Sequence, residues 1–213
     1  MAFNRILGAA FVALSFLFGA PLAHAAPIQI VAFGDSLTAG FGLDPGQAFP
    51  EKLQAALVTK GHDVVVANAG VSGDTSSGGL SRLDWSVPDG TQLVILELGA
   101  NDMLRGITPD VTENNLDAII ARLKERNIPV LLAGMLAAPN LGPDYAEAFN
   151  GIYPKLAEKH GIPLYPFFLQ GVAADKQFLL EDGMHPNAEG VDLMVEGILP
   201  AVEQALATIS GDS

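Results

Sequence analysis

Short apolar runs alternate with longer helical patterns along most of this chain. The runs are almost continuously apolar, as expected for strands whose two faces are both covered by helices. The strand-like runs are 28–33, 64–67, 93–98, 129–133 and 163–167, and the helical patterns are 49–59, 75–83, 112–126, 144–160 and 187–206. Alternating β and α units of this size predict a parallel, doubly wound sheet. We therefore expect an α/β fold, a three-layer α/β/α sandwich around a five-stranded parallel sheet.

The amino-terminal segment has the layout of a secretory signal peptide. Arg5 precedes an apolar run over residues 6–18, and the small-x-small site Ala23-His24-Ala25 follows it. An uncleaved membrane anchor is the alternative, but the run is shorter than the roughly 18 apolar residues that a span needs. We predict a cleaved signal peptide over residues 1–25 and one domain over 26–213, because no repeat, linker or low-complexity tract divides the remainder.

Charge and cysteine content restrict the partners of this protein. The 213-residue sequence has a formal net charge of −13 and no cysteine. An acidic surface repels nucleic acid and anionic lipid headgroups, so we expect neither nucleic-acid binding nor stable membrane association. Without disulfides the fold must rely on its apolar core, which 49% hydrophobic residues can supply. We expect a periplasmic or secreted monomer.

Three short polar motifs follow predicted strands. Gly34-Asp35-Ser36-Leu37 follows the first strand, Gly99-Ala100-Asn101-Asp102 follows the third, and Asp182-Gly183-Met184-His185 lies between the fifth strand and the last helix. In a doubly wound sheet of this flavodoxin-like kind, ligands bind beyond the carboxyl ends of the strands. Right-handed crossovers bring the loops at those ends to one edge of the sheet. We therefore expect the three motifs to converge.

A serine, a histidine and an aspartate in these motifs are candidates for nucleophilic catalysis. Asp182 can reach the His185 ring across the glycine turn and fix its tautomer, which leaves the other ring nitrogen to accept the Ser36 proton. Simpler structural roles exist, because Asp35 or Ser36 can cap a helix and His185 can lie exposed in a turn. The order of the three motifs along the chain and their placement after predicted strands favour catalysis. A neutral histidine base predicts activity that rises through about pH 6 to 8.

Two further groups can stabilise an oxyanion. The backbone N–H of Gly73, in the loop after the second predicted strand, can approach a substrate closely because glycine has no side chain. The side-chain amide of Asn101 can donate a second hydrogen bond. Ordinary structural roles are again the alternative: Asp74 or Thr75 can cap the next helix, and Asn101 can form a turn. Asp74 is expected to brace its loop rather than to take part in chemistry.

Competing chemistries lack their usual residues. The sequence has no His-Glu-x-x-His motif and no cysteine, so we expect no metal site. No Gly-Lys-Ser/Thr follows a glycine loop, and Gly40-Phe41-Gly42 is followed by Pro45 where a dinucleotide fingerprint requires glycine. We therefore expect no cofactor. The Gly-x-Ser-x-Gly elbow of the usual α/β-hydrolases is also missing.

With these motifs in this order, the chain resembles the SGNH (GDSL) hydrolase family over essentially all of residues 26–213. It is most similar to a small periplasmic branch of arylesterases, thioesterases and lysophospholipases. The supporting stretches are Ser72-Gly73-Asp74-Thr75, 97–102 with Leu104-Arg105-Gly106, and Phe149-Asn150-x-Ile152-Tyr153. The resemblance implies that Ser36 is the nucleophile, His185 the general base and Asp182 its orienting carboxylate. It also implies an oxyanion hole formed by the Ser36 N–H, the Gly73 N–H and the Asn101 amide.

Apolar residues near these motifs indicate the substrate class. The candidate wall for an acyl chain or aryl group consists of Leu37, Met103, Leu104, Pro139, Leu141 and Met184. We expect a small-molecule acyl ester as substrate, either a short- to medium-chain acyl ester or an aryl ester, with thioesters and lysophospholipids as further candidates. A carbohydrate O-acetylesterase or an acyltransferase on exported glycans is one alternative. A non-catalytic binding protein on the same scaffold is another.

Overall fold

One parallel sheet forms the centre of the molecule. The computed structural model describes residues 26–211, so the expected signal peptide at residues 1–25 lies outside the described residues. The strand order is β2-β1-β3-β4-β5, and every pair of neighbours is parallel. The strands are β1 (Ile28–Gly34), β2 (Val64–Gly70), β3 (Leu93–Glu97), β4 (Val130–Ala133) and β5 (Leu164–Tyr165). The expected five-stranded parallel sheet is confirmed.

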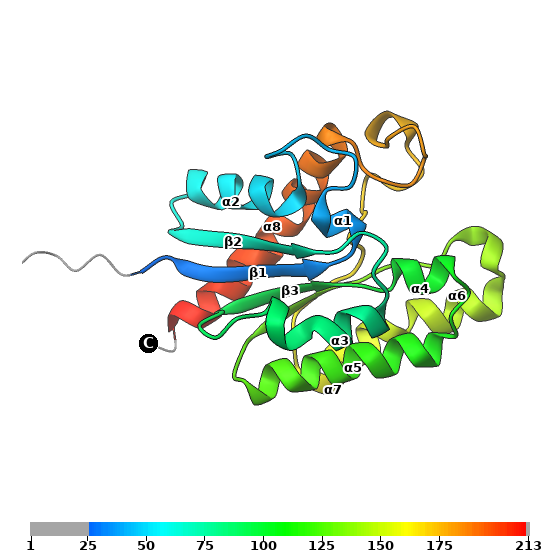
Figure 1. Ribbon diagram of the computed structural model, residues 1–213, viewed down its shortest axis with the longest axis horizontal. Helices are drawn as coiled ribbons and strands as arrows, with labels where there is room; N and C mark the ends of the chain where they lie inside the picture. The colour runs from blue at the N-terminus through cyan, green and yellow to red at the C-terminus, as the bar shows by residue number, and fades with distance from the viewer. Residues whose placement is uncertain (1–25, 212–213) are drawn as a thin grey trace, which may run out of the picture.

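Helices cover both faces of this sheet (Figure 1). The helices are α1 (Ser36–Ala39), α2 (Phe49–Thr59), α3 (Ser76–Ser86), α4 (Ala100–Leu104), α5 (Pro109–Glu125), α6 (Pro143–Asn150), α7 (Ile152–His160) and α8 (Ala188–Gly211), with short 3₁₀ turns η1 (Pro139–Leu141) and η2 (Lys176–Phe178). Helices α2 and α8 pack together on one face, and α3, α5 and α7 pack in a row on the other. The expected three-layer sandwich is therefore confirmed.

The central strands are apolar because no side of them meets water. All five residues of β3 and all four of β4 are buried. Four residues of β3 are apolar, but the fifth is Glu97, a carboxyl that is only 1% exposed. A buried strand normally excludes such a group, so Glu97 needs a structural explanation.

The strands end at the same level, which gathers the functional loops. In the register of the sheet, Phe33 of β1 lies between Ala69 of β2 and Leu96 of β3. The chain therefore leaves all three strands at one edge of the sheet, and the loops that follow lie side by side there (Figure 1). Among residues 26–211, no helix combines the length and the apolar composition that a membrane crossing requires.

The predicted helix over 144–160 is in fact two helices, α6 and α7. Pro154 lies in the first turn of α7, where a missing N–H costs no intrahelical hydrogen bond. The Asn150 side chain at the end of α6 instead accepts a hydrogen bond from the N–H of Ala137, at 2.7 Å. The short helices α1 and α4 were not predicted, because four or five residues are too few to show a period.

Candidate active site

Ser36 is the first residue of α1, directly beyond the end of β1. The Asp35 side chain caps this helix by accepting a hydrogen bond from the N–H of Leu37, at 3.0 Å. The helix ends after one turn at Gly40, whose φ of +81° is a conformation that glycine adopts without strain. This short helix places Ser36 at the sheet edge with 8% of the residue exposed.

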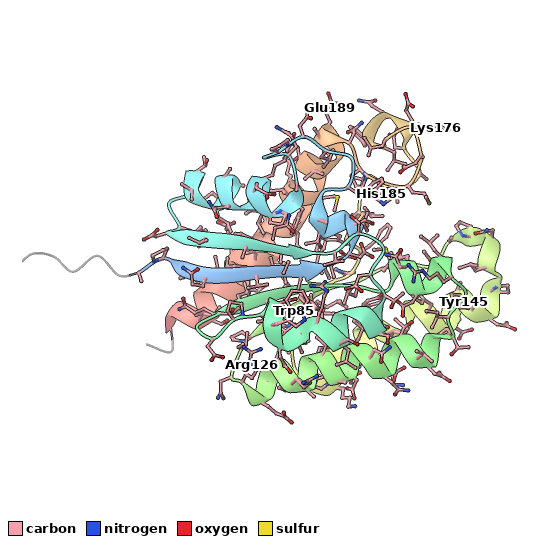
Figure 2. All side chains as sticks on the ribbon, in the orientation of Figure 1. Trp85, Arg126, Tyr145, Lys176, His185 and Glu189 are labelled. Atoms are coloured by element: carbon pink, nitrogen blue, oxygen red, sulfur yellow. The ribbon has the colours of Figure 1, made fainter. Side chains whose placement is uncertain are left out.

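The loop before α8 brings a histidine onto Ser36. His185 Nε2 lies 2.9 Å from Ser36 Oγ, and His185 Nδ1 lies 2.6 Å from Asp182 Oδ2. The three side chains therefore form one continuous hydrogen-bonded chain, although 149 positions separate Ser36 from His185. Figure 2 shows His185 beyond the carboxyl ends of the strands, next to α1.

The Asp182 carboxylate is held as an anion by its own loop. Its Oδ1 accepts hydrogen bonds from the N–H groups of Met184, at 2.9 Å, and His185, at 3.0 Å. The N–H of His185 makes the largest contribution to lowering the pKa of Asp182, which falls to about 2. The negative charge is thus retained at the position where it orients the imidazole ring and favours a proton on Nδ1.

Gly73 lies in a turn at the same edge of the sheet. Its φ is +81°, and the N–H of Asp74 closes the turn by donating to the carbonyl of Val71, at 3.0 Å. Arg105, just after α4, donates to the Gly73 carbonyl at 2.6 Å. Asp74 braces the loop from its other side by accepting from Arg82 Nε, at 2.6 Å.

The amide of Asn101 is oriented by a buried carboxylate. Asn101 Nδ2 donates to Asp35 Oδ2 at 2.9 Å, which leaves the second hydrogen of the amide for another acceptor. Asp35 is fully buried, and burial raises its pKa from 3.8 to about 6, although the hydrogen bonds from Leu37 and Asn101 lower it. Near neutral pH the carboxylate is thus available to hold this amide.

An apolar cavity of about 800 Å³ opens over Ser36 and His185. The predicted site residues Ser36, Leu37, Gly73, Asn101, Met103, Leu104, Pro139, Met184 and His185 all line it. Leu141 is not among the lining residues; it packs against the hydrophobic core instead. None of the lining residues is Asp, Glu, Lys or Arg.

Several lining residues were not anticipated from the sequence. The Phe41 ring lies against the His185 imidazole, with 4.5 Å between ring centroids. The loop between β5 and η2 contributes four apolar residues, Phe167, Leu169, Ala173 and Ala174, and Leu179 follows η2. These lining residues could have been predicted in part, because Phe41 follows β1 and the loop before η2 follows β5, and the carboxyl ends of both strands face the site.

This arrangement has the parts needed for acyl transfer. A hydroxyl lies within hydrogen-bonding distance of an imidazole, a carboxylate orients that imidazole, and an amide and a glycine turn lie beside the hydroxyl in the same cavity. Over residues 26–211 no group of three or more His, Cys, Asp or Glu side chains is arranged to hold a metal ion.

Comparison with known proteins identifies the family. Residues 32–193 match the model of the GDSL-like lipase/acylhydrolase family. The chain belongs to that family. Its relatives include an arylesterase of Vibrio mimicus, 40% identical over 79% of this chain and 84% of the relative. Another is thioesterase 1/protease 1/lysophospholipase L1 of Escherichia coli K12, 38% identical over 84% of this chain and 86% of the relative.

A solved structure agrees with the family assignment. AlinE4, an SGNH-hydrolase family esterase, is 46% identical with a TM-score of 0.73, and the match covers 86% of this chain and 99% of AlinE4. This GDSL-like acylhydrolase is therefore a serine esterase, a carboxylic ester hydrolase that acts on small-molecule esters.

Proposed function

We propose that Ser36, His185 and Asp182 are the catalytic triad of this esterase. The observation that carries the proposal is the unbroken hydrogen-bonded chain from Asp182 through His185 to Ser36. The N–H of Ser36, the N–H of Gly73 and the amide of Asn101 form the proposed oxyanion hole.

The geometry supports a two-step acyl transfer. Ser36 Oγ attacks the ester carbonyl while its proton passes to His185 Nε2, and Asp182 stabilises the resulting imidazolium. The tetrahedral oxyanion collapses as the carbon–oxygen bond to the alcohol breaks, and His185 returns the proton to the departing alkoxide. Water then attacks the acyl-enzyme with His185 again as base, which releases the acid and restores Ser36.

The cavity favours short- to medium-chain acyl esters and aryl esters. Its volume falls within the roughly 300–1,000 Å³ of typical small-molecule sites. Phe41, Leu104, Leu136 and Met184 line it while remaining exposed, so its mouth is apolar as well. Thioesters and lysophospholipids are further proposed substrates, in keeping with the name of the relative from Escherichia coli.

A panel of p-nitrophenyl esters from acetyl to hexadecanoyl tests the substrate class. We expect kcat/KM to peak between the acetyl and decanoyl esters, because the acyl chain must fit the apolar cavity beside Ser36. A peak only on the hexadecanoyl ester would contradict the proposal. Efficient deacetylation of acetylated xylan or peptidoglycan with poor turnover of aryl esters would favour the O-acetylesterase alternative, and no hydrolysis at all would favour the binding protein.

Leu104→Ser checks whether this cavity holds the acyl chain. Leu104 is 59% exposed and lines the cavity, whereas Val58 of α2 is 54% exposed and is not among the lining residues. Leu104→Ser should lower kcat/KM for octanoyl esters by about 3- to 10-fold more than for acetyl esters, since it removes apolar contact with the longer chain alone. Val58→Ser should lower neither.

Asn101→Ala tests the proposed oxyanion hole. Loss of one preorganised donor typically lowers kcat by about 100- to 1,000-fold, because the donor acts mainly on the charge that develops in the transition state. We expect that loss with little change in KM, measured on p-nitrophenyl butyrate. Asn114→Ala, on the exposed surface of α5, is the matched control and should keep wild-type kcat. A change in KM alone would assign Asn101 to ground-state binding.

We further propose that the enzyme acts outside the cytoplasm, in the periplasm or the medium, after removal of residues 1–25. The support is the charged start, apolar run and small-x-small site of that segment. We propose a monomer with no nucleic-acid partner and no stable membrane association, in keeping with its net charge of −13. The first residue of the secreted protein, from amino-terminal sequencing, tests the cleavage position.

A further inference from the structure

A buried carboxyl group, for which the described part of the chain provides no ion-pair partner, lies against the nucleophile turn, residues 35–38, which carries Ser36. Glu97, the last residue of β3, is 1% exposed. Its Oε2 accepts hydrogen bonds from the N–H of Asp35, at 3.2 Å, and from the hydroxyl of Thr38, at 2.8 Å. Its Oε1 is buried and has no hydrogen-bond partner among the described residues. An ionised carboxylate in such a place would carry a large desolvation cost.

The groups around Glu97 favour its neutral form. Asp35, before α1, is the acidic group that acts on Glu97, and both carboxyls, together with Asp102 in α4, raise the pKa of the buried Tyr153 phenol in α7. The nearby cation, Arg82 of α3, donates instead to Asp74 and to the carbonyl oxygens of Gly34 and Ala69. Burial, and then the negative charge of Asp35, raise the pKa of Glu97 well above its usual value of 4.5.

The Glu97 side chain joins the two halves of the proposed catalytic site. On one side it holds Asp35 and Thr38, which flank Ser36 in the nucleophile turn. On the other side its own backbone continues through Leu98 and Gly99 into α4, which carries Asn101. Asp35 completes the link by accepting from the Asn101 amide. One carboxyl group is therefore connected both to the turn that carries Ser36 and to the helix that carries a proposed oxyanion donor.

Gly34 supplies the space for this contact. A Cβ atom at Gly34 would collide with Thr38 Oγ1 and Glu97 Oε2. The glycine that precedes Asp35 and Ser36 is thus needed for the approach of the Glu97 carboxyl, and not for its own backbone angles.

We propose that Glu97 is a positioning residue of this esterase, a neutral carboxylic acid that fixes the Ser36 turn against the Asn101 amide. The proposal rests on the roles proposed above for Ser36 and Asn101. It goes beyond them because Glu97 lies behind the reacting groups and is not among the residues that line the cavity. Small displacements of a reacting group can lower turnover by about 100-fold, so such a support affects kcat without contacting substrate.

Glu97→Gln and Glu97→Leu test the proposal by kcat and KM on p-nitrophenyl butyrate. Glutamine is neutral and nearly isosteric, so its amide oxygen can accept from both Asp35 and Thr38, and kcat should stay within about threefold of wild type. Leucine leaves both donors unpaired, so kcat should fall by about 10- to 100-fold while KM changes little. Equal damage in both variants, or full kcat in Glu97→Leu, would overturn the proposal.

Thr38→Val is the second variant, and it tests the positioning role of Glu97 even if Glu97→Leu fails to fold. It removes one hydrogen bond to the carboxyl and keeps the shape of the side chain. A fall in kcat at constant KM supports the positioning role, and unchanged kcat overturns it. Ser36→Ala, measured in parallel, separates this proposal from the proposed function: an active Ser36→Ala refutes the triad, whereas an inactive Ser36→Ala with a fully active Glu97→Leu refutes only the role of Glu97.

The neutral state of Glu97 can be tested separately, through the pH dependence of Tm. Because its pKa is raised in the folded protein, its contribution to stability is fully present below about pH 4.5 and is lost as the pH rises towards the folded pKa. The contribution of Asp35 to stability also falls as the pH rises from 3.8 to about 6, but Asp35 is present in both wild type and Glu97→Gln, so this effect cancels in the comparison. From pH 5 to pH 9, Tm should therefore fall less in Glu97→Gln than in wild type. A constant difference in Tm over this range would overturn the neutral assignment.

Discussion

Replacing Ser36 with alanine should lower kcat on p-nitrophenyl butyrate by about 10⁴-fold or more. The variant removes the hydroxyl oxygen that the proposed triad uses to form the acyl-enzyme, while the backbone N–H of residue 36 remains for the oxyanion. Alanine fits the first turn of α1 without strain, so the fold should survive, as measured by circular dichroism and Tm. Residual turnover would come from the oxyanion hole and from substrate binding.

Ser81→Ala is the matched control for this experiment. Ser81 lies exposed on α3, where its hydroxyl donates to the carbonyl of Ser77, at 2.9 Å, and makes no contact with the proposed site. Its kcat should equal that of wild type. A Ser36→Ala variant that keeps more than about a tenth of wild-type kcat would show that another group forms the acyl-enzyme.

Asp182→Asn should lower kcat by about 10⁴-fold, with the loop intact. The asparagine carbonyl can still accept from the N–H groups of Met184 and His185, which hold the turn. Its amide nitrogen would then face His185 Nδ1 as a donor and favour the tautomer that carries the proton on Nε2. A proton on Nε2 prevents that atom from accepting the Ser36 proton.

The pH dependence of stability is an independent check that Asp182 is held as an anion in the folded protein. The pKa of Asp182 is lowered to about 2, so its contribution is present above about pH 3.8 and is lost as the pH falls through about 2. Asp182→Asn has no carboxylate to protonate at this position, so its Tm should change less than that of wild type between pH 5 and pH 2. Asp144→Asn, on the exposed first turn of α6, should match wild type in kcat and in the pH dependence of Tm. Wild-type kcat in Asp182→Asn would remove Asp182 from the triad.

The sheet could be predicted because its strands are buried on both faces. Nearly continuous apolar runs such as Leu93–Leu96 have few alternatives to a covered parallel strand, and the topology then brings Ser36, Asn101 and His185 to one edge. The split of the predicted helix was missed although Gly151 and Pro154 are local signals for a helix break; only the hydrogen bond from Ala137 to the Asn150 side chain is a tertiary contact that no local pattern reveals.

Tertiary contacts also decide which side chains line the site. Leu141 follows the same strand as Pro139, yet it packs against the core while Pro139 lines the cavity. Phe41 and Glu97 depend on segments far away in sequence: one packs on His185, and the other accepts from Asp35 and Thr38. Their roles are visible only once the chain is folded.

Labelling with a fluorophosphonate, followed by peptide mass spectrometry, shows directly whether Ser36 is an activated nucleophile. The reagent phosphonylates a serine only where a base activates it, so it reports the triad and not merely the presence of a hydroxyl. We expect one phosphonyl group per chain, located on the peptide that contains Ser36, and no adduct in Ser36→Ala. An adduct on another serine, or an unlabelled wild type that still hydrolyses esters, would contradict it.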